Sequence, residues 1–352
     1  MKVLVMGGNR YIGLQLVREL IEQGHDVTVL NSHETPSMPK GVTRLHGDRH
    51  EPGLLQRVLG PISDRFDAVF DNTSYTPEHL APMIDQFRGK VQHFIFTSSI
   101  AVYELAEAQP VDESAAVGRD AATALYGAYA AGKVGCEDLL SHEFEANGLP
   151  CTSLRITHSC GPMSPAVSRE PGTFKRLEEG RPLIIAGKVE AMVHFIHTRD
   201  AARALVAVLG KPQAAGQIYN VAGKQFSSII NYMKLMATAV GVEPNIIVMP
   251  SDMPAHMRSP IVHWLEASRG SMVFSIDKIK RDLGWEPRLT IAEGLADSYR
   301  WFRDEGGREK YEYNFSADKE VLAELERRGG FSNDDGPART VFRAQLDTLN
   351  NM

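Results

Sequence analysis

Short apolar runs alternate with longer amphipathic segments over the first 155 residues. Most of the runs are rich in Val, Ile, Leu or Phe, which favours strands at residues 2–6, 26–30, 42–46, 67–70, 91–97 and 150–156. Residues 12–23 predict a helix that Gly24 ends, because its apolar side chains share one face: Leu16, Val17, Leu20 and Ile21. Strands that alternate with helices predict a parallel sheet covered by helices on both faces.

Shorter, mixed elements follow Gly161-Pro162. The pattern predicts helices at residues 173–179, 199–209, 227–240 and 291–304, and strands at residues 192–196, 217–221 and 245–248. We therefore expect a core at residues 1–162, a smaller mixed α/β part at residues 163–305 that is interleaved with the core, and an extra tail at residues 306–352.

The tail contains one clear amphipathic helix, at residues 317–328, with Ser316 as its expected N-cap and Gly329 as its stop. This helix presents Val321, Leu322 and Leu325 on one face, and a second apolar set follows at Val341, Phe342 and Leu346. An apolar stripe needs a surface that buries it. We expect the tail to pack on its own chain or on a dimer partner.

Composition excludes several classes of protein. The 352 residues are 43% hydrophobic, so the chain can bury a large core. Its 38 basic and 44 acidic residues give a net charge of −6, which makes nucleic acid an unexpected partner. No run of about 18 apolar residues predicts a membrane span, so we expect a soluble, cytoplasmic protein. Cys136, Cys151 and Cys160 lack the paired spacing of a disulfide framework or a metal site, and no metal is expected.

A glycine-rich loop follows the first predicted strand and opens the first predicted helix, where dinucleotides bind in α/β proteins. Small residues let the backbone approach a pyrophosphate, and the helix N-terminus stabilises its charge. The loop therefore predicts a Rossmann-type, doubly wound sheet and a set of cofactor-binding residues: Gly7, Gly8, Asn9, Arg10, Tyr11, Ile12 and Gly13. A tight turn in a flavodoxin-like protein is the alternative. Arg10 replaces the usual middle glycine, and it either covers the phosphates, reaches a 2′-phosphate or points into solvent.

Two further positions bear on the choice of cofactor. Asn31 ends the second predicted strand, where an acid would bind the ribose 2′-hydroxyl of NAD and repel NADP. An asparagine can accept that hydroxyl but cannot repel a phosphate, so both NAD and NADP remain candidates. Asp48 closes the third strand, where it either meets the adenine amino group or caps the following helix.

Candidate catalytic groups follow the fifth strand and open the next helix. The segment at residues 94–103 begins in a buried strand that ends in the hydroxyls of Thr97, Ser98 and Ser99, at the edge where ligands bind in open α/β sheets. Tyr129 and Lys133 are four residues apart on a predicted helix, so their side chains share a face. An ammonium group beside a phenol lowers the phenol's pKa, which makes a general acid/base.

With these motifs the sequence resembles the extended short-chain dehydrogenase/reductase family, the NAD-dependent epimerase/dehydratase group, over residues 1–305. The resemblance also rests on several short fragments in the family's order: Val102-Tyr103 after Ser99, residues 110–113, Leu154-Arg155 through Gly161-Pro162, and residues 195–200, 219–223 and 283–287.

The resemblance implies a role for each matching residue. Tyr129 is expected to exchange a proton with a substrate oxygen, and Ser99 to orient that oxygen. Lys133 is expected to lower the pKa of Tyr129 and to hold the nicotinamide ribose. Asn72 and Thr73 lie in the segment that passes the same ribose. NAD is slightly favoured over NADP, because epimerases of this family commonly use NAD.

The chain also departs from the family pattern. His158, His197 and Arg199 are weaker candidates for substrate contacts. His158 is otherwise a packed residue, and the other two lie at a strand-to-helix junction where Thr198 can cap the helix and Asp200 can favour its dipole. The family's dehydratases carry acids after the catalytic hydroxyl, but this chain has Ile100 and Ala101, which favours hydride chemistry without dehydration. Residues 250–264 lie where the resembled family often places a substrate-covering loop, and we expect them to form the specificity region.

The sequence therefore predicts a nicotinamide-dependent oxidoreductase or epimerase that acts on a hydroxyl or keto carbon of a sugar nucleotide or a similar polar metabolite, with a homodimer expected. The alternative is a non-catalytic nucleotide- or RNA-binding member of the superfamily, because a glycine loop with a central arginine resembles that of chloroplast RNA-binding members. The intact Ser99, Tyr129 and Lys133 and the acidic net charge argue against this alternative.

Overall fold

The computed structural model describes residues 1–33, 35, 37–106, 108–165, 167–186, 189–250 and 270–328. The chain divides into two compact units, each made of three segments. Unit 1 comprises Met1–Pro165, Val193–Phe226 and Met272–Gly294. Unit 2 comprises the described residues of Ala166–Met192, Ser227–Ser271 and Leu295–Met352. Residues 193–226 and 272–294, which the sequence pattern placed in the second part, thus pack with the first.

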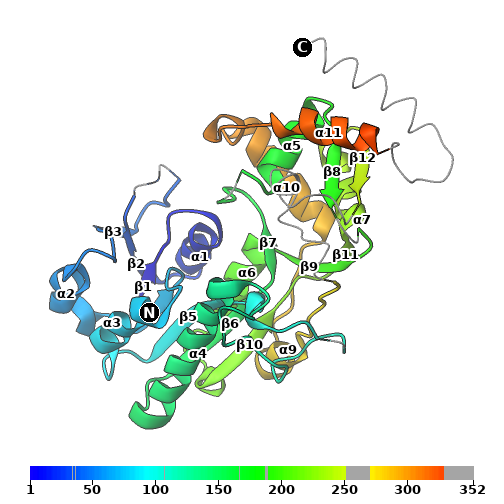
Figure 1. The fold of residues 1–352 in the computed structure, drawn as a ribbon. Coiled ribbons are helices and arrows are strands. Elements are labelled where there is room, and N and C mark those ends of the chain that lie inside the picture. Colours follow the sequence, from blue (N-terminus) through cyan, green and yellow to red (C-terminus); the bar gives the residue numbers. More distant parts are fainter. Residues whose placement is uncertain are drawn as a thin grey trace. The chain divides into compact units, whose positions relative to one another are not determined.

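Unit 1 is built on a seven-stranded sheet with the order β10-β6-β5-β4-β1-β2-β3, in which all neighbours are parallel (Figure 1). The strands are β1 (Lys2–Met6), β2 (Asp26–Asn31), β3 (Thr43–His46), β4 (Ala68–Asp71), β5 (His93–Ser99), β6 (Cys151–Ile156) and β10 (Gln217–Val221). The strand order reverses between β1 and β4, which is the switch point where ligands bind in such sheets. The predicted Rossmann-type sheet is confirmed.

Helices cover both faces of this sheet. The helices are α1 (Tyr11–Glu22), α2 (Leu54–Leu59), α3 (Pro77–Phe87), α4 (Gly127–Asn147) and α6 (Thr198–Ala207). Leu4 and Met6 of β1 join a buried cluster with apolar side chains of α2, α3 and α4. Val5 lies on the other face near Val17 of α1, and α1 packs against α6. Alternate residues of β1 therefore enter two separate cores, as a strand buried on both faces requires.

Smaller elements complete unit 1. The short strand β7 (His158–Cys160) pairs in parallel with β9 (Met192–His197), and α9 (Asp277–Leu283) packs near β10. The strand β11 (Phe226–Ser228) begins at the last residue of the second segment of unit 1. All three cysteines are buried and free of disulfides.

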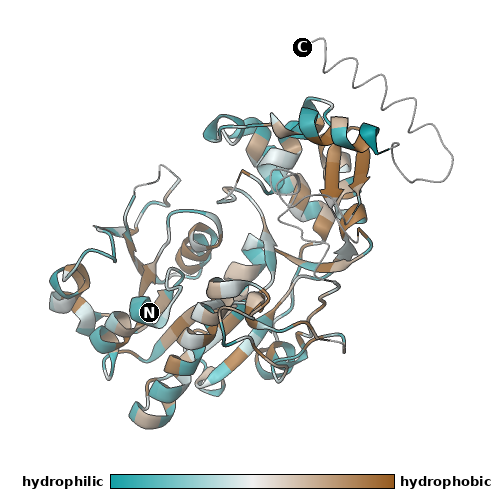
Figure 2. Ribbon diagram, in the orientation of Figure 1, coloured by the Kyte–Doolittle hydropathy of each residue, from teal (hydrophilic) through white to brown (hydrophobic). Residues whose placement is uncertain are grey.

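Unit 2 surrounds a parallel pair of strands, β8 (Leu183–Ala186) and β12 (Ile246–Met249), whose residues are mostly apolar (Figure 2). Its helices are α5 (Glu170–Glu178), α7 (Ile229–Val240), α10 (Ile291–Asp304), which starts in unit 1, and α11 (Ala317–Arg327). Phe174 of α5 lies 5.2 Å from Tyr299 and 5.6 Å from Phe302 of α10, measured between ring centroids. These rings form the aromatic centre of the unit.

The tail helix α11 packs on its own chain. Arg176 of α5 and Asp318 of α11 form a buried ion pair with an Nη2–Oδ1 distance of 2.8 Å. The side chains of Val321, Leu322 and Leu325 are buried. The expected cap is wrong, because Ser316 precedes the helix but its hydroxyl accepts no capping hydrogen bond. The expected stop at Gly329 and the apolar set at residues 341–346 lie outside the described residues.

Two features are absent from the described residues. None of their helices is long and apolar enough to cross a membrane. They also contain no group of three or more His, Cys, Asp or Glu side chains arranged to hold a metal ion.

Candidate active site

The glycine loop connects β1 to α1 by a turn in which the three glycine positions have no room for a side chain. Gly7 has a φ of +82°, which only glycine adopts without strain. A Cβ atom on Gly13 would lie 1.9 Å from the carbonyl oxygen of Gly7, and one on Gly8 would lie 2.8 Å from Val17 Cγ2. The loop therefore keeps its backbone bare at the N-terminus of α1, as binding of a pyrophosphate requires.

The middle of the loop needs no glycine. Arg10 precedes α1 in an extended conformation, with a φ of −157°, which any residue adopts. Its side chain is exposed and forms no hydrogen bond or ion pair with the part of the chain that the structure describes. Tyr11 carries the unusual backbone angle instead, with a φ of +53°, and its buried hydroxyl donates to the carbonyl oxygen of Ser159. Tyr11 thereby fixes the start of α1 against β7.

Asn31 at the end of β2 stabilises this loop directly. Its Oδ1 accepts a hydrogen bond of 2.8 Å from the backbone N–H of Gly8. Asn9 Nδ2 donates to the carbonyl oxygen of His33 over 3.1 Å. The two amide side chains hold the loop against the end of β2, where an adenosine ribose lies in dinucleotide-binding sheets.

Asp48 follows β3 and does not cap the next helix. Its Oδ1 accepts from the backbone N–H of His50 over 2.9 Å, which closes a local turn. The residue that precedes α2 is Gly53, so the helix-cap alternative for Asp48 is wrong.

The segment after β4 is fixed by a buried carboxylate that the sequence analysis missed. Asp71 is fully buried and accepts from the backbone N–H groups of Thr73 and Ser74, each over 2.9 Å. Arg49 lies 2.9 Å from Asp71 and also donates to Thr73 Oγ1 over 2.6 Å. Burial alone would raise the pKa of Asp71, but Arg49 and the hydrogen bonds hold it below its ordinary value. A charged residue at the end of a buried strand was the available signal.

The same segment carries Asn72 toward β5. Asn72 Oδ1 accepts a hydrogen bond of 2.5 Å from Thr97 Oγ1. Its Nδ2 is buried and donates to no atom of the described residues. A buried donor without an acceptor is unfavourable, so this amide is suited to a bound ligand.

Lys133 is buried beneath the carboxyl ends of β4 and β5. Its side chain is 2% exposed, and its Nζ donates to the carbonyl oxygens of Ser74 and Thr97, each over 2.8 Å. The ammonium lies 4.9 Å from the ring centroid of Tyr75 and 4.6 Å from that of Phe96. Burial lowers the pKa of Lys133 to about 8, although nearby thiol and carboxyl groups oppose this shift. The Lys133 ammonium group is thus held where it is almost inaccessible to water.

Tyr129 lies one helical turn before Lys133 on α4 and is 43% exposed. Its ring centroid is 6.1 Å from that of Tyr75, the residue that covers Lys133. Ser99 ends β5, and its Oγ accepts from the backbone N–H of Ala101 over 3.2 Å. The accessible phenol and the serine are therefore carried by neighbouring rigid elements of one unit.

Several fragments that carry the family resemblance meet in one buried polar network below this site. Arg155 of β6 pairs with Glu137 of α4, and Glu137 also accepts from Ser98 Oγ over 2.5 Å. The Arg155 guanidinium lies 4.7 Å from the ring centroid of Tyr103, whose hydroxyl donates to Asn220 of β10 over 2.7 Å. These motif residues position the strand ends and α4. Ser98 belongs to the network, which leaves Ser99 as the serine outside it.

The weaker candidates on β7, β9 and α6 differ in exposure. His197 is 4% exposed, and its Nδ1 accepts from the backbone N–H of Arg199, so His197 caps α6. The expected cap by Thr198 is wrong, because its buried hydroxyl has no hydrogen-bond partner among the described residues. Arg199 is exposed, and the His158 ring lies 6.3 Å from that of Phe195.

Known proteins resemble this chain over most of its length. The model of the NAD dependent epimerase/dehydratase family matches residues 3–80 and 65–222. The chloroplast stem-loop binding protein of 41 kDa b from Arabidopsis thaliana is 28% identical over 339 residues, which cover 92% of this chain and 84% of that protein.

Solved structures share the fold at lower identity. A UDP-glucose 4-epimerase from Thermotoga maritima, solved with UDP-glucose, is 20% identical with a TM-score of 0.72, covering 87% of this chain and 99% of that one. A dTDP-glucose 4,6-dehydratase from Bacillus anthracis, solved with NAD, is 16% identical with a TM-score of 0.71, covering 87% and 98%. Together with the matched family model, the glycine loop and the Tyr129–Lys133 helix, these likenesses mean that the chain belongs to the NAD-dependent epimerase/dehydratase family of extended short-chain dehydrogenases/reductases.

Proposed function

We propose that this protein is a nicotinamide-dependent oxidoreductase or epimerase that acts on a hydroxyl or keto carbon of a sugar nucleotide or a similar polar metabolite. The observation that carries the proposal is the burial of Lys133, one turn from the accessible Tyr129 and bonded to the ends of two strands. A buried ammonium group is costly, and a position one helical turn from an accessible phenol gives it a chemical use. The nucleotide-sugar relatives support the class of substrate.

The residues of the loop and of the strand ends fit a dinucleotide. The bare backbone at Gly7, Gly8 and Gly13 suits a pyrophosphate, and the buried Nδ2 of Asn72 offers a donor near the end of β4. In this assignment Asn31 and Asp48 face the adenosine half, and Asn72, Thr73 and Lys133 the nicotinamide half. When bound, the nicotinamide ring accepts or supplies a hydride.

The chain's own residues handle the proton and the orientation of the substrate. Tyr129 takes the proton from the substrate hydroxyl as the carbon is oxidised and returns it as the carbon is reduced. The Lys133 charge stabilises the phenolate form of Tyr129, which is the form that accepts this proton. Ser99 donates a hydrogen bond to the same substrate oxygen. His158, His197 and Arg199 remain proposed contacts to the rest of the substrate.

NAD is the proposed cofactor, with NADP second. Asn31 is an amide whose oxygen accepts from the Gly8 N–H, so no carboxylate at this position repels a 2′-phosphate. Arg10 is exposed beside the loop. The preference therefore rests on the family's NAD-bound members. Titration of both cofactors against intrinsic fluorescence decides it, and an NADP preference above tenfold, about 1.4 kcal/mol, overturns the proposal.

The reaction is tested with purified protein and UDP-sugars. Tight retention of nucleotide through purification, with conversion of one sugar epimer into the other and no net change at 340 nm, indicates an epimerase. Exchange of the cofactor at each turnover, with a stoichiometric change at 340 nm, indicates a reductase. Light scattering measures the proposed homodimer. No conversion of hydroxyl or keto substrates in any assay contradicts the proposal.

The Arabidopsis relative favours a second candidate, which is binding of a nucleic-acid stem-loop. The exposed Arg10 at the mouth of the loop is available for such a contact. Against it stands the net charge of −6, because affinity for nucleic acid rests mainly on neutralised phosphates. A gel shift with a stem-loop RNA that weakens steeply with salt, combined with no turnover, selects this candidate.

A further inference from the structure

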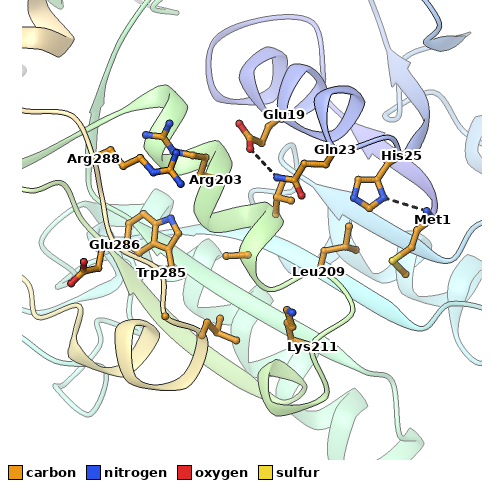
Figure 3. Close-up of a pocket in the computed structure, with 14 residues that line it drawn as sticks. Met1, Glu19, Gln23, His25, Arg203, Leu209, Lys211, Trp285, Glu286 and Arg288 are labelled. Atoms are coloured by element: carbon orange, nitrogen blue, oxygen red, sulfur yellow. Dashed lines mark hydrogen bonds between the residues drawn. The ribbon is translucent and has the colours of Figure 1, made fainter.

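A cavity of about 460 Å³ lies in unit 1 at the edge of the sheet where β1 starts, away from the candidate active site (Figure 3). It lies among the end of α1, the end of α6 and the loop at residues 283–288. The side chains that matter here are Arg203, Val206, Leu209, Lys211, Trp285 and Arg288. None of them has a role in the proposed oxidoreductase chemistry.

Asp200 connects α6 with the loop at residues 283–288, which line two sides of this cavity. Its side chain is fully buried and pairs with Arg203 on the same helix, α6. Its two oxygens also accept from the backbone N–H groups of Arg288 and Leu289, over 3.0 and 2.9 Å. The loop that carries Trp285 and Arg288 is thus fixed to α6, so the cavity is a built feature of the fold.

The cavity gathers hydrogen-bond donors that have no acceptor among the described residues. Trp285 is 7% exposed, and its buried indole Nε1 has no acceptor within the part of the chain that the structure describes. The buried Nε of Arg203 also has no acceptor there. The exposed side chains of Lys211 and Arg288 form no ion pair or hydrogen bond with described residues. An indole, a guanidinium and an ammonium can only donate, so the missing group is an acceptor.

The nearby acids do not fill this role. Glu286 pairs with Lys280, and Figure 3 draws its carboxylate turned away from the labelled cations. Glu19 Oε1 accepts from Gln23 Nε2 over 2.8 Å on the α1 side of the cavity. Figure 3 draws Arg203, Trp285 and Arg288 on the side of the cavity opposite Glu19 and Gln23, and Lys211 also lines the cavity.

We propose that this cavity binds a small phosphate monoester, with the phosphate among Trp285, Arg288 and Lys211. Guanidinium groups bind phosphate oxygens through paired hydrogen bonds, and a lysine adds a point charge. The volume lies in the range of ligand pockets and exceeds the need of a free phosphate ion. Val206, Leu209 and the Trp285 ring offer apolar surface to the organic part of the ester.

The test observes the indole N–H signals of the full-length protein by NMR, with the Trp285 signal assigned from Trp285→Phe. Inorganic phosphate and phenyl phosphate are titrated separately. We expect phenyl phosphate to move the Trp285 signal saturably and to bind more tightly than inorganic phosphate. Equal affinity for the two would overturn the assignment to an ester and leave an oxyanion site. Absence of a saturable shift with both probes would overturn the proposal.

Charge variants locate the binding. Arg288→Gln and Lys211→Gln should each weaken phenyl phosphate by about tenfold, as the loss of one charged hydrogen bond does. Arg281→Gln is the matched control, because Arg281 is exposed, lies outside the cavity and carries the same charge. Equal weakening by all three variants would mean diffuse attraction, which contradicts the site. Binding at the glycine loop is distinguished in the same way, since these variants leave it unchanged.

Discussion

Arg155 Nη2 and Glu137 Oε2 lie 2.7 Å apart in a buried ion pair between β6 and α4. Glu137 follows Lys133 by one helical turn, so this pair anchors the helix that carries Tyr129 and Lys133. The position of the candidate acid/base therefore depends on a charge pair below it.

Glu137→Ala should lower the free energy of unfolding by about 3 to 5 kcal/mol, because it leaves the Arg155 guanidinium buried and unpaired. Urea unfolding measures the change. Asp138→Ala on the same helix is the matched control, since Asp138 pairs with Arg119 at the surface and should change the free energy by about 1 kcal/mol or less. Equal losses in the two variants would contradict a structural role for the buried pair.

Tyr129→Phe should keep cofactor binding and reduce turnover by about 10²- to 10⁴-fold, because the ring is retained and the proton-transferring hydroxyl is lost. Steady-state rates and a cofactor titration measure the two effects separately. Tyr126→Phe, just before α4, should keep the wild-type rate. Retention of more than about half of the wild-type rate by Tyr129→Phe would remove this residue from the mechanism.

Because of Lys133, the free energy of unfolding should rise as pH increases from about 8 toward 10.5. Burial lowers the pKa of Lys133 from 10.5 to about 8, so between these values the unfolded chain binds a proton that the folded chain has lost. The free energy of unfolding then rises with pH, by about 2 to 3 kcal/mol over the window. Urea unfolding of wild type and Lys133→Met at pH 8 and pH 10 isolates this contribution. If the difference in the free energy of unfolding between wild type and Lys133→Met is the same at pH 8 and pH 10, the prediction is wrong.

His93 should destabilise the protein in acid. Its Nε2 is 2.8 Å from Thr152 Oγ1, whose hydroxyl donates to Ala214, and its Nδ1 accepts from the backbone N–H of Gly210 over 3.2 Å. Both ring nitrogens are thus used in the neutral form, and burial lowers the pKa of His93 to about 4.

The unfolded chain takes up a proton at His93 near pH 6.5, and the folded chain does so only near pH 4, so the stability is complete above pH 6.5 and is lost as pH falls between these values. The loss should be about 2 kcal/mol at pH 4.5. His93→Gln can donate and accept in the same place without titrating. Thermal unfolding at pH 7 and pH 4.5 should therefore show a smaller acid loss in this variant, and an equal loss would refute the assignment.

The hydrophobic pattern predicted the sheet and its helices, because each element buries a face and its apolar residues therefore recur in the sequence at the spacing of a strand or a helix. The strand at residues 217–221 and the helix at residues 291–304 have the bounds that periodicity predicts. The short strands β7, β8 and β11 were missed, because three or four residues do not establish a period.

The partners of polar groups were harder to predict. Thr198 has the residue type of an N-cap, but His197 performs the capping, because the choice depends on which side chain reaches Arg199 N–H in three dimensions. Asp71 and Arg49 are 22 residues apart, and nothing local in the sequence indicates their pairing. The placement of Tyr129 and Lys133 one turn apart could be predicted, because a helix makes residues four apart neighbours.

The interleaving of unit 1 also determines when it can be completed during synthesis on the ribosome. The first 165 residues supply every strand of the sheet except β10, so the edge of β6 stays unpaired until residues 217–221 have emerged. Val111, in the loop that follows Ser99, exchanges backbone hydrogen bonds with Val273 and Ser275 over 2.7 and 2.9 Å. A nascent chain can therefore form its glycine loop early, while the flank of its candidate catalytic serine waits for residues about 160 positions later.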